Sequence, residues 1–330
     1  MLRTLLFTLA ASLFAGPAAA ACEGPSFYDR FTPEERAALD AAVRAVPFNE
    51  GLVFEATKGT DRLTLVGTIH IFDPALRQMA DDLRNDLEDA DLLLVEATQE
   101  DAAALQAHMA AYPEIMFLTD GPTLPEMLDE DTWERVMSAA RDRQIPSALA
   151  AKMQPWFLSL SLAIAPCAMA DMMSGNQGLD FLLMDLADDT GTPTQSLESW
   201  NFVINLLREG TIEEQLEMLE IGLLPGDLQS EMFVAMTEVY LQERPAEVWE
   251  ASRIALNYIP GLDLEKGLTL FEEAEDLLLR QRNENWVLVI ERAVREHDNV
   301  MIAVGAAHLP YEFGLLRLLE ERGWTITRRD

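Results

Sequence analysis

Two of the four histidines in this chain occur in the same sequence context. Residues 67–70 read Gly-Thr-Ile-His and residues 305–308 read Gly-Ala-Ala-His, and each Gly-x-x-His motif follows a short apolar run. Imidazole is both a metal ligand and a proton carrier near neutral pH. A single histidine at the end of a strand is commonly a structural hydrogen-bonding residue, but the repeated motif favours a shared function for His70 and His308.

A carboxylate follows a third apolar run. Residues 91–95 read Asp-Leu-Leu-Leu-Val, and Glu96 comes directly after them. Two imidazoles and a carboxylate are a common ligand set for a divalent transition metal, which would lower the pKa of a bound water to about 7 and polarise a carbonyl group. Glu96 and a histidine could instead activate water without a metal, or Glu96 could simply begin a solvated loop.

These residues can meet only if the apolar runs form neighbouring strands, because His70 and His308 are 308 − 70 = 238 positions apart. Side chains just past the carboxyl ends of strands in an open sheet lie where ligands bind. We therefore predict an α/β fold whose central sheet is built from N- and C-terminal segments, with a large, mostly helical region at about 99–295 between them. Periodicity and turn signals predict strands at 52–57, 63–66, 91–95, 192–197, 299–304 and 324–327, and helices at 33–46 and 314–322.

The first 21 residues have the features of a secretory signal peptide: an early Arg3, the apolar run 5–15, a Gly-Pro break and an alanine-rich end. The apolar run is shorter than the roughly 20 residues that span a bilayer, and the mature chain 22–330 is predicted to contain no membrane segment. We therefore predict export to the periplasm or the extracellular space. The two cysteines, Cys22 and Cys167, predict one disulfide; a lipoprotein anchored at Cys22 is the alternative.

The charge of the chain argues against two classes of partner. There are 24 Lys and Arg against 57 Asp and Glu, so the formal charge is 24 − 57 = −33. Such a surface repels phosphates and anionic headgroups, which argues against nucleic-acid binding and electrostatic docking to membranes. The sequence also lacks a Gly-x-Ser-x-Gly elbow, a P-loop and a His-Glu-x-x-His helix, so serine hydrolase, nucleotide-dependent and zincin chemistries are unsupported.

The motif segments 65–70, 94–96 and 304–309 resemble those of the TraB/GumN family, which is related to the TIKI metalloproteases. The likeness extends over nearly the whole mature chain and includes residues 154–156, 178–180, 197–198 and 282–283. The resemblance implies a single α/β domain of the erythromycin-esterase/ChaN-like type and, for the TIKI branch, peptide hydrolysis that depends on Mn or Co. It assigns the two motif histidines to His70 and His308 and the acid to Glu96.

Three further residues match family positions: Asp180, Arg282 and Asn283. Asp180 would be a fourth metal ligand or a general acid, or only a favourable charge in the first turn of a helix. Arg282 would hold a substrate carboxylate or, like Asn283, the oxyanion of a tetrahedral intermediate. The alternative for Arg282 is an ion pair with an acid earlier on its own helix, namely Glu272, Glu273 or Glu275.

One position departs from the family pattern. The family usually has glycine three residues after the second histidine, and this chain has Tyr311, preceded by Pro310. Because glycine readily adopts a positive φ, we predict that this loop has a different shape here. That change would narrow the mouth of the site or mark an inactive branch.

Together these observations predict an exported, metal-dependent hydrolase of amide or peptide bonds. His70, His308 and Glu96 would hold a divalent transition metal, Mn or Co, whose bound water attacks the carbonyl group. The other three matched residues would steady the negative charge and assist proton transfer. Two alternatives stay open: a haem- or metal-binding protein of the same fold without turnover, and a metal-free esterase that uses His and Glu.

Overall fold

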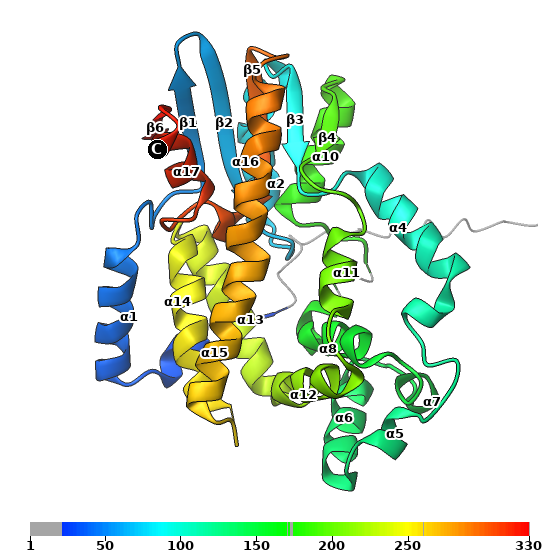
Figure 1. Cartoon of the computed structure of the whole chain (residues 1–330). Coiled ribbons are helices and arrows are strands. Elements are labelled where there is room, and N and C mark those ends of the chain that lie inside the picture. Colours follow the sequence, from blue (N-terminus) through cyan, green and yellow to red (C-terminus); the bar gives the residue numbers. More distant parts are fainter. Residues whose placement is uncertain (1–21, 170, 172–173, 260, 330) are drawn as a thin grey trace, which may run out of the picture.

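A mixed sheet of six strands lies at one end of the molecule (Figure 1). This computed structural model describes residues 22–169, 171, 174–259 and 261–329, so the predicted signal peptide lies outside the described residues. The strands follow one another in the order β4-β3-β5-β2-β1-β6. Their bounds are β1 Val53–Lys58, β2 Asp61–Thr68, β3 Leu92–Val95, β4 Thr194–Ser196, β5 Asn299–Gly305 and β6 Thr325–Arg328.

Strand β5 joins the two ends of the chain. It lies between β2 and β3 and pairs with both in parallel, and β4 extends the parallel set beyond β3. β1 and β2, at the predicted strands 52–57 and 63–66, form an antiparallel hairpin, and β6 pairs with the other edge of β1. The predicted α/β fold is thereby confirmed, because N-terminal and C-terminal segments share one sheet.

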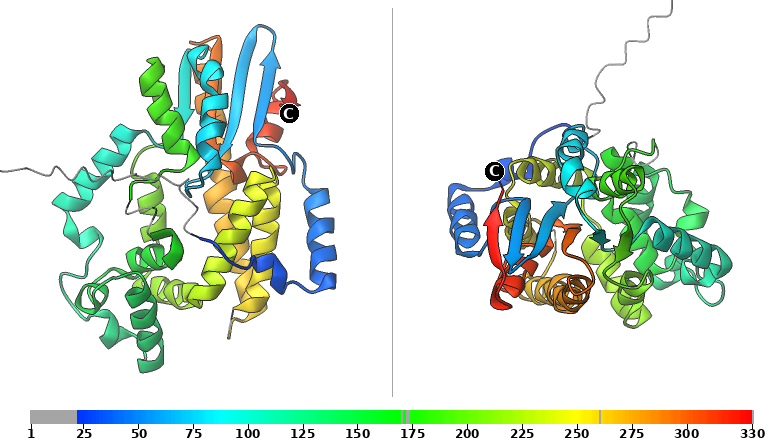
Figure 2. Two further views of the ribbon diagram at one scale, coloured as in Figure 1. Left: turned by 180° about the vertical axis from the view of Figure 1, so that it is seen from behind. Right: turned by 90° about the horizontal axis from the view of Figure 1, so that it is seen from above.

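The strands are buried on both faces. In β5, Val300, Ile302 and Val304 point to one hydrophobic core while Met301 and Ala303 point to another, as the two-residue period of a strand requires. Helices α16 and α17 cover the first face, and α2, α3 and α10 cover the second (Figure 2). The bounds of these helices are α2 Ala75–Asp82, α3 Arg84–Glu88, α10 Leu179–Thr190, α16 Gln281–Ala293 and α17 Leu315–Glu321.

Most of the remaining helices lie on the side of the sheet toward which the arrowhead of β3 points (Figure 1). The predicted helical region at 99–295 is confirmed, with β4 inside it at the position of the predicted strand 192–197. None of the described helices has both the length and the apolar composition needed to cross a bilayer. The helices are α1 Pro33–Ala45, α4 Gln99–Ala111, α5 Leu124–Met127, α6 Glu130–Asp142, α7 Ser147–Ala150, α8 Pro155–Ala163, α11 Phe202–Arg208, α12 Ile212–Gly222, α13 Gly226–Leu241, α14 Pro245–Ala255 and α15 Leu264–Glu275, with short 3-10 turns at Phe27–Arg30, Pro113–Ile115, Pro166–Ala168, Leu256–Tyr258 and Ala306–His308.

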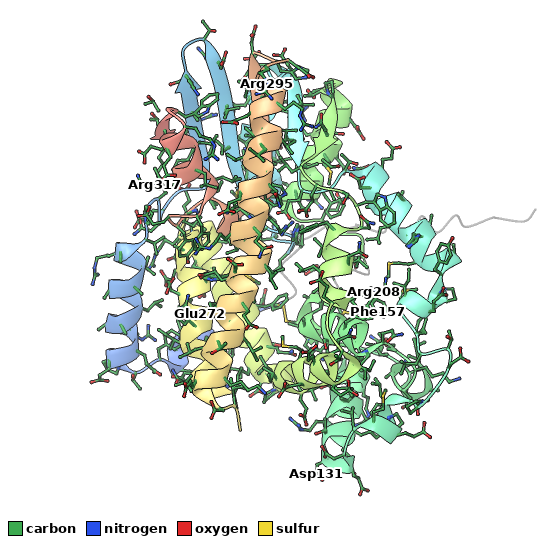
Figure 3. All side chains as sticks on the ribbon, in the orientation of Figure 1. Asp131, Phe157, Arg208, Glu272, Arg295 and Arg317 are labelled. Atoms are coloured by element: carbon green, nitrogen blue, oxygen red, sulfur yellow. A yellow bond between two sulfur atoms is a disulfide. The ribbon has the colours of Figure 1, made fainter. Side chains whose placement is uncertain are left out.

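Helices α15 and α16 are continuous, joined by the π-helical turn Asp276–Arg280. The combined helix runs from Leu264 in the helical part to Ala293 beside the sheet; Glu272 lies on it and Arg295 just past its end (Figure 3). Such π-helical turns within α-helices are frequent at functional sites. This one comes directly before Arg282 and Asn283, the two residues of α16 that the sequence assigns to the site.

Cys22 and Cys167 form the predicted disulfide. It ties the first described residue to the 3-10 turn that follows α8, 145 positions further along the chain. A sulfur in a disulfide cannot also carry a lipid, so this pairing opposes the lipoprotein alternative. Disulfides form and persist in oxidising compartments.

The loop after His308 keeps the backbone conformation that glycine favours. Tyr311 has φ 79°, so the prediction that this position would be shaped differently is wrong. A positive φ is strained for a residue with a side chain, and contacts of the ring offset that strain. The Tyr311 hydroxyl donates to the carbonyl oxygen of Ala246 in α14 (3.2 Å), and the ring stacks on Phe313 with 5.1 Å between centroids.

Candidate functional site

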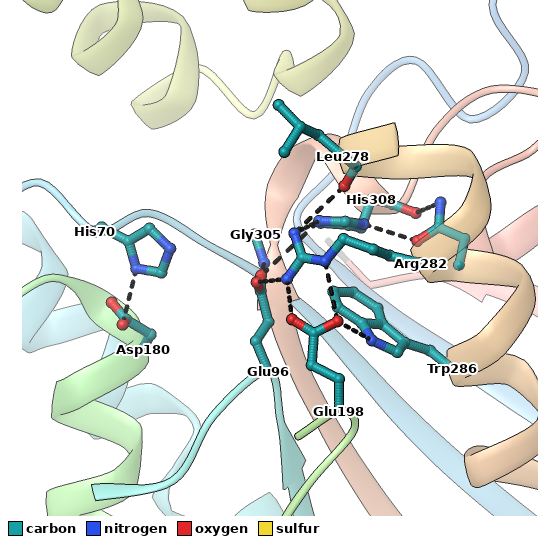
Figure 4. Close-up of polar contacts among 10 residues, drawn as sticks. His70, Glu96, Asp180, Glu198, Leu278, Arg282, Trp286, Gly305 and His308 are labelled. Atoms are coloured by element: carbon teal, nitrogen blue, oxygen red, sulfur yellow. Dashed lines mark hydrogen bonds and ion pairs between the residues drawn. The ribbon is translucent and has the colours of Figure 1, made fainter. Parts of the chain in front are cut away.

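Four parallel strands each deliver an ionisable side chain to the same edge of the sheet (Figure 4). β2 is followed by His70, β3 by Glu96, β4 by Glu198 and β5 by His308. Because β4, β3, β5 and β2 are neighbours in that order, their carboxyl ends lie side by side. The four side chains separate into two groups, one buried and one exposed.

The buried group, called the buried cluster below, consists of Glu96, Glu198, Arg282 and His308. Glu96 Oε1 accepts a hydrogen bond from the backbone N–H of Gly305 (2.7 Å), and Glu96 Oε2 accepts one from Arg282 Nη2 (2.6 Å). A Cβ atom on residue 305 would lie 3.2 Å from Glu96 Oε1, so the glycine of the second motif allows this close approach. Burial alone would raise the pKa of Glu96, but the basic groups around it, His308 and Arg282 above all, hold that pKa below its ordinary value.

The hydrogen bonds of His308 assign its proton to one ring nitrogen. The side-chain nitrogen of Asn283 donates to the carbonyl oxygen of Phe313 (2.9 Å), so the Asn283 oxygen faces His308 Nδ1 at 2.7 Å. Nδ1 therefore carries the proton and Nε2 keeps its lone pair. That lone pair faces Arg282 Nη1 at 3.4 Å, and Nε2 lies 4.0 Å from Glu96 Oε1. Burial lowers the pKa of His308 to about 4, so the ring is neutral at pH 7.

Arg282 lies at the centre of the buried cluster, with only 8% of its side chain exposed. Nε donates to Glu198 at 3.1 Å, and Nη2 donates to Glu198 at 2.7 Å and to Glu96 at 2.6 Å. Nη1 donates to the carbonyl oxygen of Leu278 at 3.3 Å and faces the lone pair of His308 Nε2 at 3.4 Å. An arginine has five N–H groups, and here each of them has a protein acceptor.

Glu198 is the member of the buried cluster that was not predicted as a site residue. Besides its bonds from Arg282, its Oε2 accepts a hydrogen bond from Trp286 Nε1 at 3.0 Å. A strand was predicted at 192–197, and Glu198 follows that strand just as Glu96 follows β3. The same rule, an acid directly after a strand of the sheet, could have identified it.

The ion pair considered for Arg282 within its own helix is not formed. Glu275 instead accepts hydrogen bonds from Trp249 (2.7 Å) and Arg253 (3.1 Å), while Arg282 pairs with acids that follow two strands. The side-chain nitrogen of Asn283 is also engaged, because it donates to two backbone carbonyl oxygens. An oxyanion role for either residue would require it to exchange a protein acceptor for the substrate.

His70 and Asp180 form the second group, called the exposed dyad below. His70 Nδ1 lies 2.9 Å from Asp180 Oδ2, and 66% of the His70 side chain is exposed. The first turn of α10 is held against this histidine, because the N–H of Leu179 donates to the carbonyl oxygen of Ile69 (2.9 Å). A Cβ atom on Gly178 would lie only 2.2 Å from that oxygen. The hydrogen bond to Asp180 raises the pKa of His70 to about 9, so imidazolium is its main form at pH 7.

The exposed dyad and the buried cluster interact through their charges. His70 and Glu96 each shift the other's pKa in the direction expected of opposite charges, while the hydrogen bond drawn for His70 goes to Asp180 (Figure 4). Asp180 Oδ1 is buried and has no hydrogen-bond partner. The dyad is therefore within electrostatic range of the cluster, but the two are separate hydrogen-bonded units.

The donor types at this edge suit a divalent transition metal, but their arrangement does not. Among the residues that the structure describes, no three or more His, Cys, Asp or Glu side chains are grouped so that they could hold an ion. The guanidinium of Arg282 lies against both Glu96 and His308. Binding of Mn or Co by His70, Glu96 and His308 stays a prediction.

A cavity of about 470 Å³ opens beside β3 and β4. Thr98 and Ser196 line it, and each stands two residues from an acid of the buried cluster. Ligand pockets commonly have volumes of roughly 300 to 1,000 Å³. The lining of this cavity comes from the segments that follow or form these strands and from α10, and the acids Glu96 and Glu198 themselves do not line it.

A model of the TraB/PrgY/gumN family matches residues 52–328. The matched segment contains all six strands, the buried cluster and the exposed dyad. No curated protein matches the chain.

Proposed function

The chain belongs to the TraB/PrgY/gumN family, and we propose that it is an exported hydrolase of amide or peptide bonds. One observation carries the proposal: a buried histidine bonded to Asn283 and an exposed histidine paired with Asp180 stand with acids at one edge of the sheet, and their surroundings lower the pKa of the first and raise that of the second. Environments that push the pKa values of two groups apart suit them to act as base and acid in one reaction. The bond class follows from the resemblance to the TIKI metalloproteases, and the disulfide supports export.

In this proposal Glu96 and His308 hold the attacking water. Glu96 Oε1 and His308 Nε2 are both acceptors, and the 4.0 Å between them is too long for a direct hydrogen bond. One water can donate a hydrogen to Glu96 Oε1 and, in place of the 3.4 Å contact from Arg282 Nη1, its other hydrogen to His308 Nε2, which leaves an oxygen lone pair directed at the substrate carbonyl. His308 Nε2 then accepts a proton from that water as the new carbon–oxygen bond forms.

The exposed dyad would supply the proton that the leaving group needs. An amine leaves a tetrahedral intermediate only after its nitrogen has been protonated. His70 holds one proton on Nδ1, toward Asp180, and carries the second on Nε2 in its imidazolium form. Because most of the ring is exposed, Nε2 can reach a substrate that binds over the edge of the sheet.

The test is hydrolysis of a mixture of unstructured peptides by the purified mature protein, followed by mass spectrometry. His70→Ala, Glu96→Gln and His308→Ala should each lower the rate by about 10²-fold or more. His108→Ala is the matched control, since His108 lies on α4 and contacts Tyr112 and Trp200. A rate that none of the three site substitutions changes would reject the proposal.

Two further measurements separate the alternatives. Elemental analysis of the native protein beside His70→Ala and His308→Ala tests the predicted Mn or Co, which should be lost in both variants if these residues hold it. Cleavage of ester but not peptide substrates that survives exhaustive chelation would support the metal-free esterase. A Soret band on haem titration, with no hydrolysis, would support the binding protein without turnover.

A further inference from the structure

The buried cluster has the composition of a cation site. Two carboxylates, Glu96 and Glu198, and one imidazole nitrogen with a lone pair surround a single position at the edge of the sheet. This combination of oxygen and nitrogen donors is typical of sites for divalent transition metals. The position is filled by a side chain of the protein itself, the guanidinium of Arg282.

The guanidinium is held there from several sides. Glu198 binds it through two parallel hydrogen bonds, the strongest geometry for an arginine–carboxylate pair. The ring of Trp286 lies against it, with 4.5 Å between the guanidinium carbon and the ring centroid, and the indole N–H fixes Glu198 Oε2. Because all five of its N–H groups have protein acceptors, the guanidinium has no donor left over for a substrate oxyanion.

We infer that Arg282 is the built-in cation of this site, in the position that a divalent ion would otherwise take between Glu96, Glu198 and His308. Its charge allows two carboxylates to be buried together, since buried acids need a paired cation. It also fixes Glu96 Oε2, so that Oε1 remains directed at the water proposed above. Arg282 is thus a positioning residue. Only this last point rests on the proposed function.

The inference predicts that removing Arg282 converts the cluster into a metal site. Arg282→Ala removes the positive charge that Glu96, Glu198 and His308 surround, so the two carboxylates have no paired cation. After chelation and dialysis, isothermal titration with Mn²⁺ or Co²⁺ should show one ion per chain, bound at least about 100-fold more tightly than by the wild type. A change of about 2.7 kcal/mol corresponds to that factor. The metal should also raise the melting temperature of the variant and not that of the wild type.

Two variants control this experiment. Arg280→Ala removes an arginine from the same helix whose partner is Asp276 (3.2 Å) and which lies outside the cluster, and it should bind metal as weakly as the wild type. The double variant Arg282→Ala with Glu198→Gln removes one of the three donors and should lose the acquired affinity. A folded Arg282→Ala protein without metal affinity overturns the inference.

The wild-type protein decides the question even if Arg282→Ala does not fold. About one Mn or Co per chain in native protein, lost in His308→Ala, would show that an ion and not Arg282 completes the site. Native protein without that metal supports the inference. These readouts do not involve turnover, so a protein that cleaves no peptide but acquires metal in Arg282→Ala would reject the proposed function and keep the inference.

Discussion

The buried cluster and the exposed dyad use the same kinds of side chain, histidine and carboxylate, in opposite environments. In the cluster every side-chain nitrogen of Arg282 and His308 has a partner, and only 8% of the Arg282 side chain is exposed. In the dyad one hydrogen bond joins His70 to Asp180, the ring is mostly exposed, and one oxygen of Asp180 has no partner. The cluster is thus organised before any substrate arrives, whereas the dyad has bonding capacity left for one.

This difference separates the two roles that charged groups take in a site. Hydrogen bonds made in advance hold the cluster in one geometry, which costs nothing at the moment of reaction. His70 is mostly exposed and its Nε2 is not used in the dyad, so this nitrogen can bind to the substrate instead. Substitutions in the cluster should therefore affect folding as well as chemistry, and substitutions in the dyad should affect chemistry much more than folding.

The largest expected effect on folding comes from removing one acid of the cluster. Glu198→Ala leaves Arg282 and Trp286 without their shared acceptor, and breaking a buried ion pair in this way should lower the free energy of unfolding by about 3 to 5 kcal/mol. Urea denaturation followed by circular dichroism measures it. Glu217→Ala is the control, because Glu217 pairs with Lys266 at the surface and should cost at most about 1 kcal/mol. Equal losses in the two variants would mean that burial does not distinguish the pairs.

Asn283→Ala tests whether the neutral hydrogen bonds around His308 stabilise the buried cluster as its ion pairs do. It removes the acceptor of His308 Nδ1 and the donor to the carbonyl oxygen of Phe313, and two unpaired buried groups should cost about 1 to 3 kcal/mol. Hydrolysis should fall as well, since nothing then fixes the proton of His308 on Nδ1. Asn257→Ala, at an exposed asparagine, should stay within about 0.5 kcal/mol of the wild type. A fully stable Asn283→Ala protein would remove Asn283 from this role.

The strands and the meeting of His70, Glu96 and His308 at one edge follow from local sequence signals. In this chain short apolar runs followed by glycine or an acid indicated the ends of strands, and the repetition of Gly-x-x-His suggested that two such ends are neighbours. The sequence did not predict the order of the strands in the sheet, in which β5 lies between β2 and β3.

The partners of Arg282 could not be predicted in this way. The local alternative was an acid seven to ten positions earlier on the same helix, but the actual acceptors are 84 and 186 positions distant. Tyr311 illustrates the same limit. The preference of glycine for a positive φ predicted that tyrosine would change the backbone here, but Tyr311 keeps φ 79°. Its hydroxyl is held by Ala246 in α14, 65 positions away, a contact that no local pattern predicts. Local patterns predict helices and strands and where they end, whereas tertiary packing determines which side chains pair with one another.

His70→Ala should separate chemistry from folding. The side chain is mostly exposed and makes one hydrogen bond, so its removal should change the free energy of unfolding by less than about 1 kcal/mol. The rate of peptide hydrolysis should nevertheless fall by about 10²-fold or more. Both quantities are measured on the same preparation, with His108→Ala as the control for each. A destabilisation as large as that of Glu198→Ala would show that His70 is needed for folding and not only for chemistry.

The smallest effect on folding is expected from Asp180→Asn, which tests the electrostatics of the dyad directly. The folded-state pKa of His70, about 9, lies above the value of about 6.5 for an unfolded chain. The ion pair therefore stabilises the protein fully below pH 6.5, and this contribution is lost as the pH rises through 9. Titration of the His70 ring by NMR should show a pKa that falls toward 6.5 in Asp180→Asn. Asp185→Asn, on the same helix but bonded to Gln99 (2.7 Å), should leave it near 9, and a His70 pKa that is the same in both variants would mean that Asp180 does not control its proton.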